Sequence, residues 1–165
     1  RVLAGDGSAA AYGERPPELG GATVGEELLR PTRIYVREAM ALLDAGVDVR
    51  AMAHITGDGL LNLLRVRAAD VGFVLDALPR PPAVFDLIAD RAGVDRAEMY
   101  TTFNMGVGFC VVVPEAEADR ALVWLREAGG EAWPIGRATR DPEKRMGLPG
   151  VGLVGRGKAF APGAL

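Results

Sequence analysis

Hydrophobic and polar positions follow a helical period in several parts of the chain. Between residues 34 and 43, apolar residues recur every three or four positions, which predicts an amphipathic helix with one buried face. The positions on that face are Ile34, Val36, Ala39, Met40 and Leu43. Gly46 is a suitable end for this helix, because glycine readily adopts the left-handed backbone that closes a last turn.

Other helices are predicted from capping residues and proline positions. They are a short helix capped by Thr23 and Glu26, a helix through residues 60–64, one opened by Pro81 and Pro82, a brief one capped by Asp95, and one over residues 115–128.

Short apolar runs predict strands at residues 51–56, 72–75, 109–113 and 131–139. The unbroken apolar character of residues 51–55 and 109–113 favours two central strands that are buried on both faces. The mixed order of elements predicts an α/β (α+β) fold with a mixed, largely antiparallel sheet covered by helices. We expect one domain over residues 1–165, with a strap at 1–21, a core at 22–139 and a loop-like tail at 140–165.

The composition of the chain excludes several classes of binding partner and site. The 165 residues carry a net charge of -3, which gives no positive field for binding nucleic acid or an anionic membrane. One cysteine, Cys110, and one histidine, His54, exclude an internal disulfide and a Cys/His metal site. Cys110 lies in an apolar run and is interpreted as a core residue. No apolar run approaches the ~20 residues of a membrane span, so we expect a cytoplasmic protein whose partners are small molecules or other proteins.

A first candidate site lies at residues 53–60, where a predicted strand meets a glycine-rich turn. A following helix would present backbone N–H groups to phosphate or carboxylate oxygens, with His54 and Thr56 beside the ligand. The alternative is a buried histidine next to a sharp turn. Asp58 argues against an anion here unless magnesium or a basic residue lies beside it.

A second candidate site lies at residues 101–108, directly before the most apolar strand. Asparagine and glycine accept left-handed backbone angles, so this turn can bring amide groups close to a ligand, with Asn104 orienting it. The alternative is a tight turn that simply leads into the sheet.

Two other signals are interpreted as structural. Residues 150–155 have the glycine spacing of a dinucleotide fingerprint, but too little chain follows for the helix and acidic residue which that fold requires, so we expect turns there. Arg33, Arg65 and Arg67 could hold phosphate, yet exposed arginines more often form surface ion pairs.

Taken together, several motifs resemble phosphoribosylformylglycinamidine cyclo-ligase, the aminoimidazole ribonucleotide synthetase family, over its C-terminal half. They are Gly-Glu-Glu-Leu-Leu-Arg-Pro-Thr-Arg-Ile-Tyr-Val at 25–36, Ala-Met-Ala-His-Ile-Thr-Gly at 51–57, Glu-Met-Tyr at 98–100 and Phe-Asn-Met-Gly-Val-Gly at 103–108. The resemblance implies an enzyme that uses ATP and magnesium to close the imidazole ring of a purine precursor. It also implies a likeness in fold to selenophosphate synthetase, thiamine monophosphate kinase and a hydrogenase maturation factor.

The resemblance implies a role for each site residue. It makes His54 catalytic, and it makes the following residues bind substrate phosphate: Thr56, Gly57, Gly59, Asn104, Gly106 and Gly108. It implies a missing N-terminal half that carries ATP and magnesium, and a homodimer of the complete enzyme. Asp58 stands where the family commonly has glycine, and Thr101 where it usually has arginine. These departures keep open a second hypothesis, a non-catalytic binding or interaction module of the same fold. A third alternative is a related phosphate-handling enzyme of that fold, such as selenophosphate synthetase or thiamine monophosphate kinase.

Overall fold

The structure, a computed structural model, describes residues 2–67 and 70–165. Its helices are α1 (Ala9–Gly13), η1 (Pro17–Leu19), α2 (Val24–Leu28), α3 (Val36–Asp44), η2 (Gly59–Arg65), α4 (Ala83–Ala92), α5 (Arg96–Thr102), η3 (Glu115–Glu117) and α6 (Ala118–Glu127), where η marks a 3-10 helix. Its strands are β1 (Ala51–His54), β2 (Val71–Val74), β3 (Phe109–Val112), β4 (Arg137–Arg140), β5 (Arg145–Leu148), β6 (Leu153–Arg156) and β7 (Ala159–Pro162).

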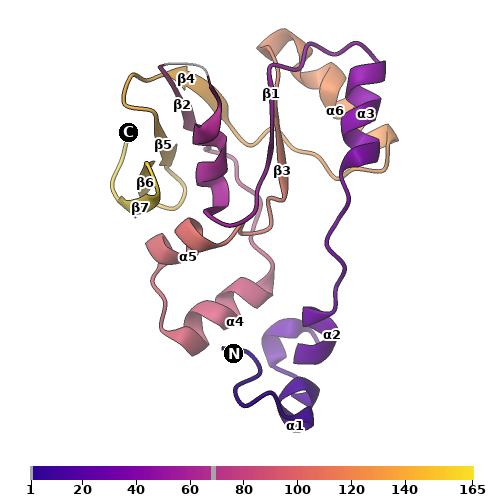
Figure 1. Cartoon of the computed structure of the whole chain (residues 1–165), viewed down its shortest axis with the longest axis vertical. Helices are drawn as coiled ribbons and strands as arrows, with labels where there is room; N and C mark the ends of the chain where they lie inside the picture. Colours follow the sequence, from indigo (N-terminus) through magenta and orange to yellow (C-terminus); the bar gives the residue numbers. More distant parts are fainter. Residues whose placement is uncertain (1, 68–69) are drawn as a thin grey trace.

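The strands form two sheets (Figure 1). β1 and β3 pair antiparallel, with Ala51 opposite Val112 and His54 opposite Phe109. The other sheet has the order β4-β2-β5-β6-β7, in which β2 and β5 run parallel and the remaining neighbours antiparallel. This arrangement confirms the predicted α+β class with mixed, largely antiparallel pairing.

The main core lies between η2 and the five-stranded sheet. Leu60 of η2 and Met146 and Leu148 of β5 are fully buried in one cluster, to which β2, α5 and β7 also contribute. Burial of this apolar surface is the main force that holds η2 against the five-stranded sheet. The predicted helix over 60–64 exists, but it is wound as a 3-10 helix.

Capping signals in the sequence are confirmed. Thr23 and Glu26 form the reciprocal capping box at α2, and the Asp95 carboxylate accepts a hydrogen bond from the Glu98 N–H at the start of α5. Gly46 has a φ of +65° just after α3, as the predicted helix end requires. Short-range hydrogen bonding decides these positions, so the sequence reveals them directly.

The expected loop-like tail is wrong, because β5, β6 and β7 supply three strands of the larger sheet. Glycines hide the strand pattern here, yet they permit close packing. A Cβ at Gly155 would lie 2.6 Å from both Leu61 Cδ2 and Phe160 Cε1. The dinucleotide fingerprint is correctly rejected, since β6 leads into β7 rather than into a helix.

The predicted central position of residues 51–55 and 109–113 is also wrong. Within the described residues, β1 and β3 pair with each other, and most of their residues are half-buried. A strand is predicted at 131–139, but the observed strand β4 is shorter and begins later, at Arg137. Pro134 has no N–H to give to a sheet, which fits the irregular backbone before β4.

The predicted buried face of α3 is wrong as well. Val36, Met40 and Leu43 are exposed, whereas Leu42 is fully buried and packs with Ala121 of α6. α6 therefore covers the side of α3 opposite to the predicted stripe (Figure 1).

The N-terminal strap has more structure than expected. It contains α1 and η1, and its residues Leu3 and Ala4 are buried with Val24 of α2 and Leu87 of α4. The strap thus closes a small cluster of its own next to α4. An extended segment then leads from α2 to α3 (Figure 1).

Candidate functional site

The two glycine-bearing segments meet at one end of the β1–β3 pair. β1 ends at His54 where β3 begins at Phe109, and the Ile55 N–H donates to the Gly108 carbonyl at 2.9 Å. Antiparallel pairing therefore brings together two turns that are about 50 residues apart in sequence. Residues predicted from both segments lie at this one place.

His54 is exposed at this end and is framed by two aromatic rings. The Tyr35 ring meets it edge-on, with 5.9 Å between centroids, and the Phe109 ring lies 6.2 Å away. Tyr35 also stacks on Phe109 at 5.2 Å. These contacts orient the imidazole while leaving it accessible, so the interpretation of His54 as a buried core residue does not fit.

Tyr35 is tied to the second turn as well as to His54. A Cβ at Gly108 would overlap the Tyr35 hydroxyl, so the glycine is what lets the ring lie against the strand. Tyr35 precedes α3, and its role in joining the linker to both turns cannot be inferred from local sequence. Burial raises the pKa of Tyr35, which keeps its hydroxyl protonated at neutral pH.

The first turn has an unusual backbone. Asp58 and Gly59 have φ values of +70° and +53°, and the Gly59 N–H donates to the Thr56 carbonyl at 3.1 Å. Thr56, Gly57 and Asp58 are exposed, while Gly59 is buried. The expected helix after the turn is the 3-10 helix η2 of seven residues. The exposed turn itself, rather than the helix end, is therefore the part that a ligand can reach.

Arg65 is the basic residue that lies beside the Asp58 carboxylate. Its guanidinium forms an ion pair with the Asp58 carboxylate. A basic residue thus lies beside the carboxylate and neutralises its charge at the turn. Arg65 is a surface ion-pair partner, as its residue type predicts, and its position next to this turn is visible only in the fold.

The second turn is held by Asn104. Its Oδ1 accepts a hydrogen bond from the Gly106 N–H at 3.0 Å, and its carbonyl accepts one from the Val107 N–H at 2.9 Å. Gly106 has a φ of +92°, and a Cβ there would lie 2.6 Å from the Pro82 ring. The side chain of Asn104 therefore shapes the turn, in addition to any contact with a ligand.

Thr101 has a structural role in this chain. Its hydroxyl donates to the Ala97 carbonyl at 2.8 Å and accepts from the Phe160 N–H at 2.9 Å, which joins α5 to β7. Thr101, which stands where the family resemblance led us to expect arginine, thus links α5 to the C-terminal β6–β7 hairpin.

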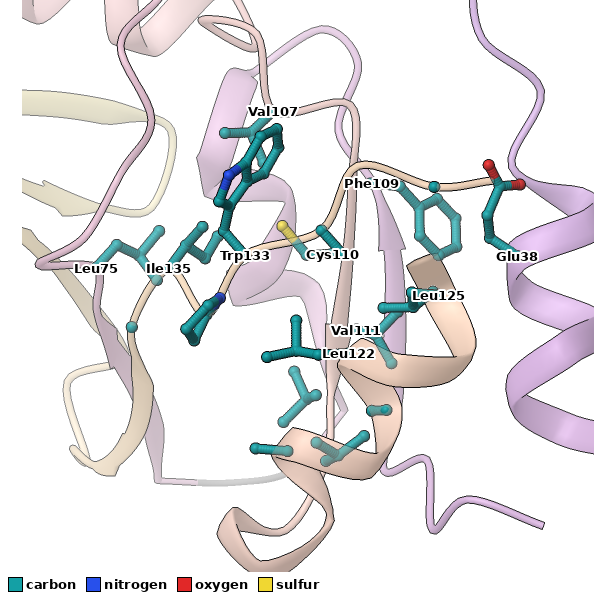
Figure 2. Close-up of a pocket in the computed structure, with 18 of the residues that line it drawn as sticks. Glu38, Leu75, Val107, Phe109, Cys110, Val111, Leu122, Leu125, Trp133 and Ile135 are labelled. Atoms are coloured by element: carbon teal, nitrogen blue, oxygen red, sulfur yellow. The ribbon is translucent and has the colours of Figure 1, made fainter. Parts of the chain in front are cut away.

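A cavity of about 750 Å³ lies beside β3 (Figure 2). Figure 2 shows Leu75 and Ile135 on one side of it, Leu122 and Leu125 on another, and Trp133 beside Val107. Gly106 and Gly108 are among its lining residues, whereas His54 and the first turn are not. Cys110 also lines it, and burial raises the pKa of its thiol to about 12, so the sulfur is neutral and acts as a core group.

An ion pair between the exposed Arg33 and the buried Glu38 supports the linker before α3. Arg33 donates to Glu38 at 2.8 Å and to the Gly129 carbonyl at 2.8 Å. Burial raises the pKa of Glu38 and is the largest single effect on it. The hydrogen bonds from Arg33 and from the backbone, together with the charges of Arg33 and Arg37, outweigh burial and hold that pKa below its ordinary value of 4.5. The stabilisation is therefore present above about pH 4.5 and is lost as the pH falls through the lowered pKa.

Replacing Arg33 with methionine is expected to destabilise the protein by about 1 kcal/mol at neutral pH, because Glu38 loses its partner. The pKa of Glu38 then rises, so the difference from wild type should shrink as the pH is lowered toward about 4. Urea unfolding across this range measures it. Arg50→Met, which breaks the exposed pair with Asp48, is the control and should cost less than about 0.5 kcal/mol. An Arg33→Met deficit that is independent of pH would contradict this account.

The described residues contain no group of three or more His, Cys, Asp or Glu side chains placed to hold a metal ion. In the same part of the chain, every helix is too short or too polar to cross a bilayer.

Comparison with known proteins identifies the family. Residues 4–148 match the model of the AIR synthase related protein, C-terminal domain. The phosphoribosylformylglycinamidine cyclo-ligase of Methanothermobacter thermautotrophicus is 55% identical over 117 residues, which are 71% of this chain and 33% of that protein. The cyclo-ligase of Symbiobacterium thermophilum is 46% identical over 145 residues, 86% of this chain and 40% of that protein.

The chain thus spans about a third to two fifths of the length of these curated relatives. Both turns of the candidate site lie inside the matched range, while β6 and β7 lie beyond it. The chain belongs to the AIR synthase related family and corresponds to that family's C-terminal domain.

Proposed function

We propose that this chain is the C-terminal part of an ATP-dependent phosphoribosylformylglycinamidine cyclo-ligase. The reaction closes the ring of formylglycinamidine ribonucleotide to give aminoimidazole ribonucleotide in purine biosynthesis, in a cytoplasmic enzyme. The observation that carries the proposal is the meeting of the His54 turn and the Asn104–Gly108 turn at one end of β1–β3. Relatives named as this enzyme, at up to 55% identity, support it.

In this proposal the two turns form one wall of the active-site cleft. The formyl amide oxygen is phosphorylated by ATP, an internal nitrogen attacks the activated carbon, and the phosphate leaves with that oxygen. The backbone of Thr56, Gly57 and Gly59 on one turn, and of Gly106 and Gly108 on the other, lines the place where the substrate's phosphate binds. Gly57 is exposed and has open space beside its backbone, so the first turn meets the ligand there. His54 donates a hydrogen bond to the oxygen that gains negative charge and exchanges a proton there.

ATP and magnesium belong, in this proposal, to the part of the enzyme outside this chain. The described residues offer no cluster of acidic side chains suited to magnesium, so none of the steps assigned to this chain runs through a metal. A homodimer of the complete enzyme is also proposed, and this rests on membership of the family.

Asp58 is the observation that favours a second candidate, a non-catalytic binding module. Its exposed carboxylate stands at the turn, and a carboxylate there weakens an anion site. The ion pair with Arg65 offsets that charge, which is why the enzyme is the preferred function.

An assay of ADP formation tests the proposal. The complete protein that contains this chain is expected to form ADP in a reaction that depends on formylglycinamidine ribonucleotide, and the 165-residue chain alone to form none. A complete protein that binds the nucleotide without forming ADP would support the binding module and contradict the enzyme.

A further inference from the structure

Asn62 is a polar residue within an otherwise apolar run of η2. It follows two leucines and precedes two more, and it is 4% exposed. A buried amide among leucines costs free energy unless it is hydrogen-bonded. Its surroundings therefore indicate what the residue does.

The Asn62 side chain holds both carbonyls of the first turn. Its Nδ2 donates to the Gly57 carbonyl at 2.9 Å and to the Gly59 carbonyl at 2.8 Å. These two residues flank Asp58, whose positive φ reverses the chain direction. One buried amide group thus fixes the two peptide units on either side of the turn's tip.

These hydrogen bonds set the direction of the turn's donors. A trans peptide points its C=O and its N–H in opposite directions, and the described chain contains no cis peptide. Because the Gly57 carbonyl points toward Asn62, the N–H of Asp58 in the same peptide unit points away from it. Asp58 is exposed, and in the proposed function this N–H is the donor that the first turn offers to the ligand.

The remaining polar atom of the amide has no such partner in the described part of the chain. Among the described residues, Asn62 Oδ1 is buried without a hydrogen-bond partner. An unpaired buried acceptor is destabilising, whereas the two hydrogen bonds that Nδ2 donates are stabilising. Within residues 2–67 and 70–165, the polar contacts of the Asn62 side chain are thus directed to the turn and to nothing else.

We propose that Asn62 is a positioning residue that holds the Gly57–Gly59 turn in the conformation that binds the substrate's phosphate. The inference rests on the proposed function and deepens it. Asn62 acts through the backbone of the turn and does not itself touch the substrate.

The test compares Asn62→Asp and Asn62→Ala with Leu61→Ala in the complete enzyme. Asn62→Asp keeps the shape of the side chain but replaces both N–H donors by an acceptor that repels the two carbonyls. Leu61 lies next to Asn62, is 3% exposed and packs toward Gly155. Leu61→Ala keeps the hydrogen bond from the Leu61 backbone N–H to the Asp58 carbonyl and removes only side-chain packing, so it lowers stability and is the matched control.

Two readouts are measured: kcat and KM for formylglycinamidine ribonucleotide, and the Kd for the same nucleotide by calorimetry. Both Asn62 variants are expected to raise KM and Kd by about tenfold or more with kcat within about threefold. Leu61→Ala should lower the unfolding temperature and leave KM and Kd unchanged.

Each outcome decides the matter. If KM and Kd are unchanged in folded Asn62 variants, the positioning role is overturned. It is also overturned if Leu61→Ala weakens nucleotide binding as much as the Asn62 variants do. If the wild-type protein binds the nucleotide but does not turn it over, the proposed function fails and the Kd values alone decide the role of Asn62. If the wild type does not bind it, both proposals fail.

Discussion

Replacement of His54 by asparagine in the complete enzyme is expected to lower turnover by about 100-fold, with little change in unfolding temperature. The imidazole is exposed and contacts the rings of Tyr35 and Phe109. Asparagine fills a similar volume and can still donate a hydrogen bond, but it cannot exchange a proton near neutral pH. Steady-state kinetics and thermal unfolding of the same preparation measure the two effects.

The control for this variant is Arg156→Asn, an exposed position on β6 in the other sheet. It introduces the same side chain away from both turns and should leave turnover within about twofold of wild type. Full turnover in a stable His54→Asn enzyme would remove His54 from the catalytic residues. A loss of stability with normal turnover per folded molecule would instead make it a packing residue.

Replacement of Gly59 by alanine is expected to destabilise the protein by about 3 kcal/mol, which lowers the unfolding temperature by about 10 °C. Two effects add. The φ of +53° is unfavourable for a residue with a Cβ. A Cβ would also overlap the Tyr100 carbonyl and lie 2.6 Å from the Phe103 carbonyl, both of which are backbone atoms that cannot rotate away.

Gly57→Ala is the matched control in the same turn. A Cβ at Gly57 has open space within 4 Å, and its φ lies outside the left-handed region. Its unfolding temperature should stay within about 2 °C of wild type. Equal effects of the two substitutions would contradict the close approach of the first turn to the backbone of residues 100–103.

The features of the fold that are fixed by short-range chemistry could be predicted from sequence. Thr23, Asp95 and Gly46 act through hydrogen bonds and backbone angles within one helical turn, and each was placed correctly. Burial could not be predicted in the same way. Val36 and Met40 have the spacing of a core face, but α6 packs on the opposite side of α3. Tertiary contacts decide which of two apolar faces is covered.

The C-terminal strands were missed for a related reason. Gly147 and Gly155 interrupt the alternation of side chains that marks a strand, and their value lies in long-range packing. A Cβ at Gly147 would lie 2.8 Å from Leu165, and one at Gly155 would meet Leu61 of η2. Such contacts join segments distant in sequence, so only the fold reveals them.

The candidate site was found in part. Glycine turns next to apolar strands identified His54, Gly57, Asn104 and their neighbours, and pairing of β1 with β3 brings the two groups together. Their catalytic and binding roles stay predictions. Tyr35 was missed because it reaches the site across the fold. Asn62 could have been found from sequence, because a polar residue inside a run of leucines is expected to be buried and must then be hydrogen-bonded.

The central claim is that the two turns form one binding wall for the substrate's phosphate. A crystal structure of the complete enzyme with bound formylglycinamidine ribonucleotide tests it most directly. Ligand oxygens are expected within about 3.2 Å of backbone N–H groups from both the Gly57–Gly59 turn and the Gly106–Gly108 turn, with the His54 ring beside them. A nucleotide bound away from the β1–β3 end, with neither turn in contact, would contradict it.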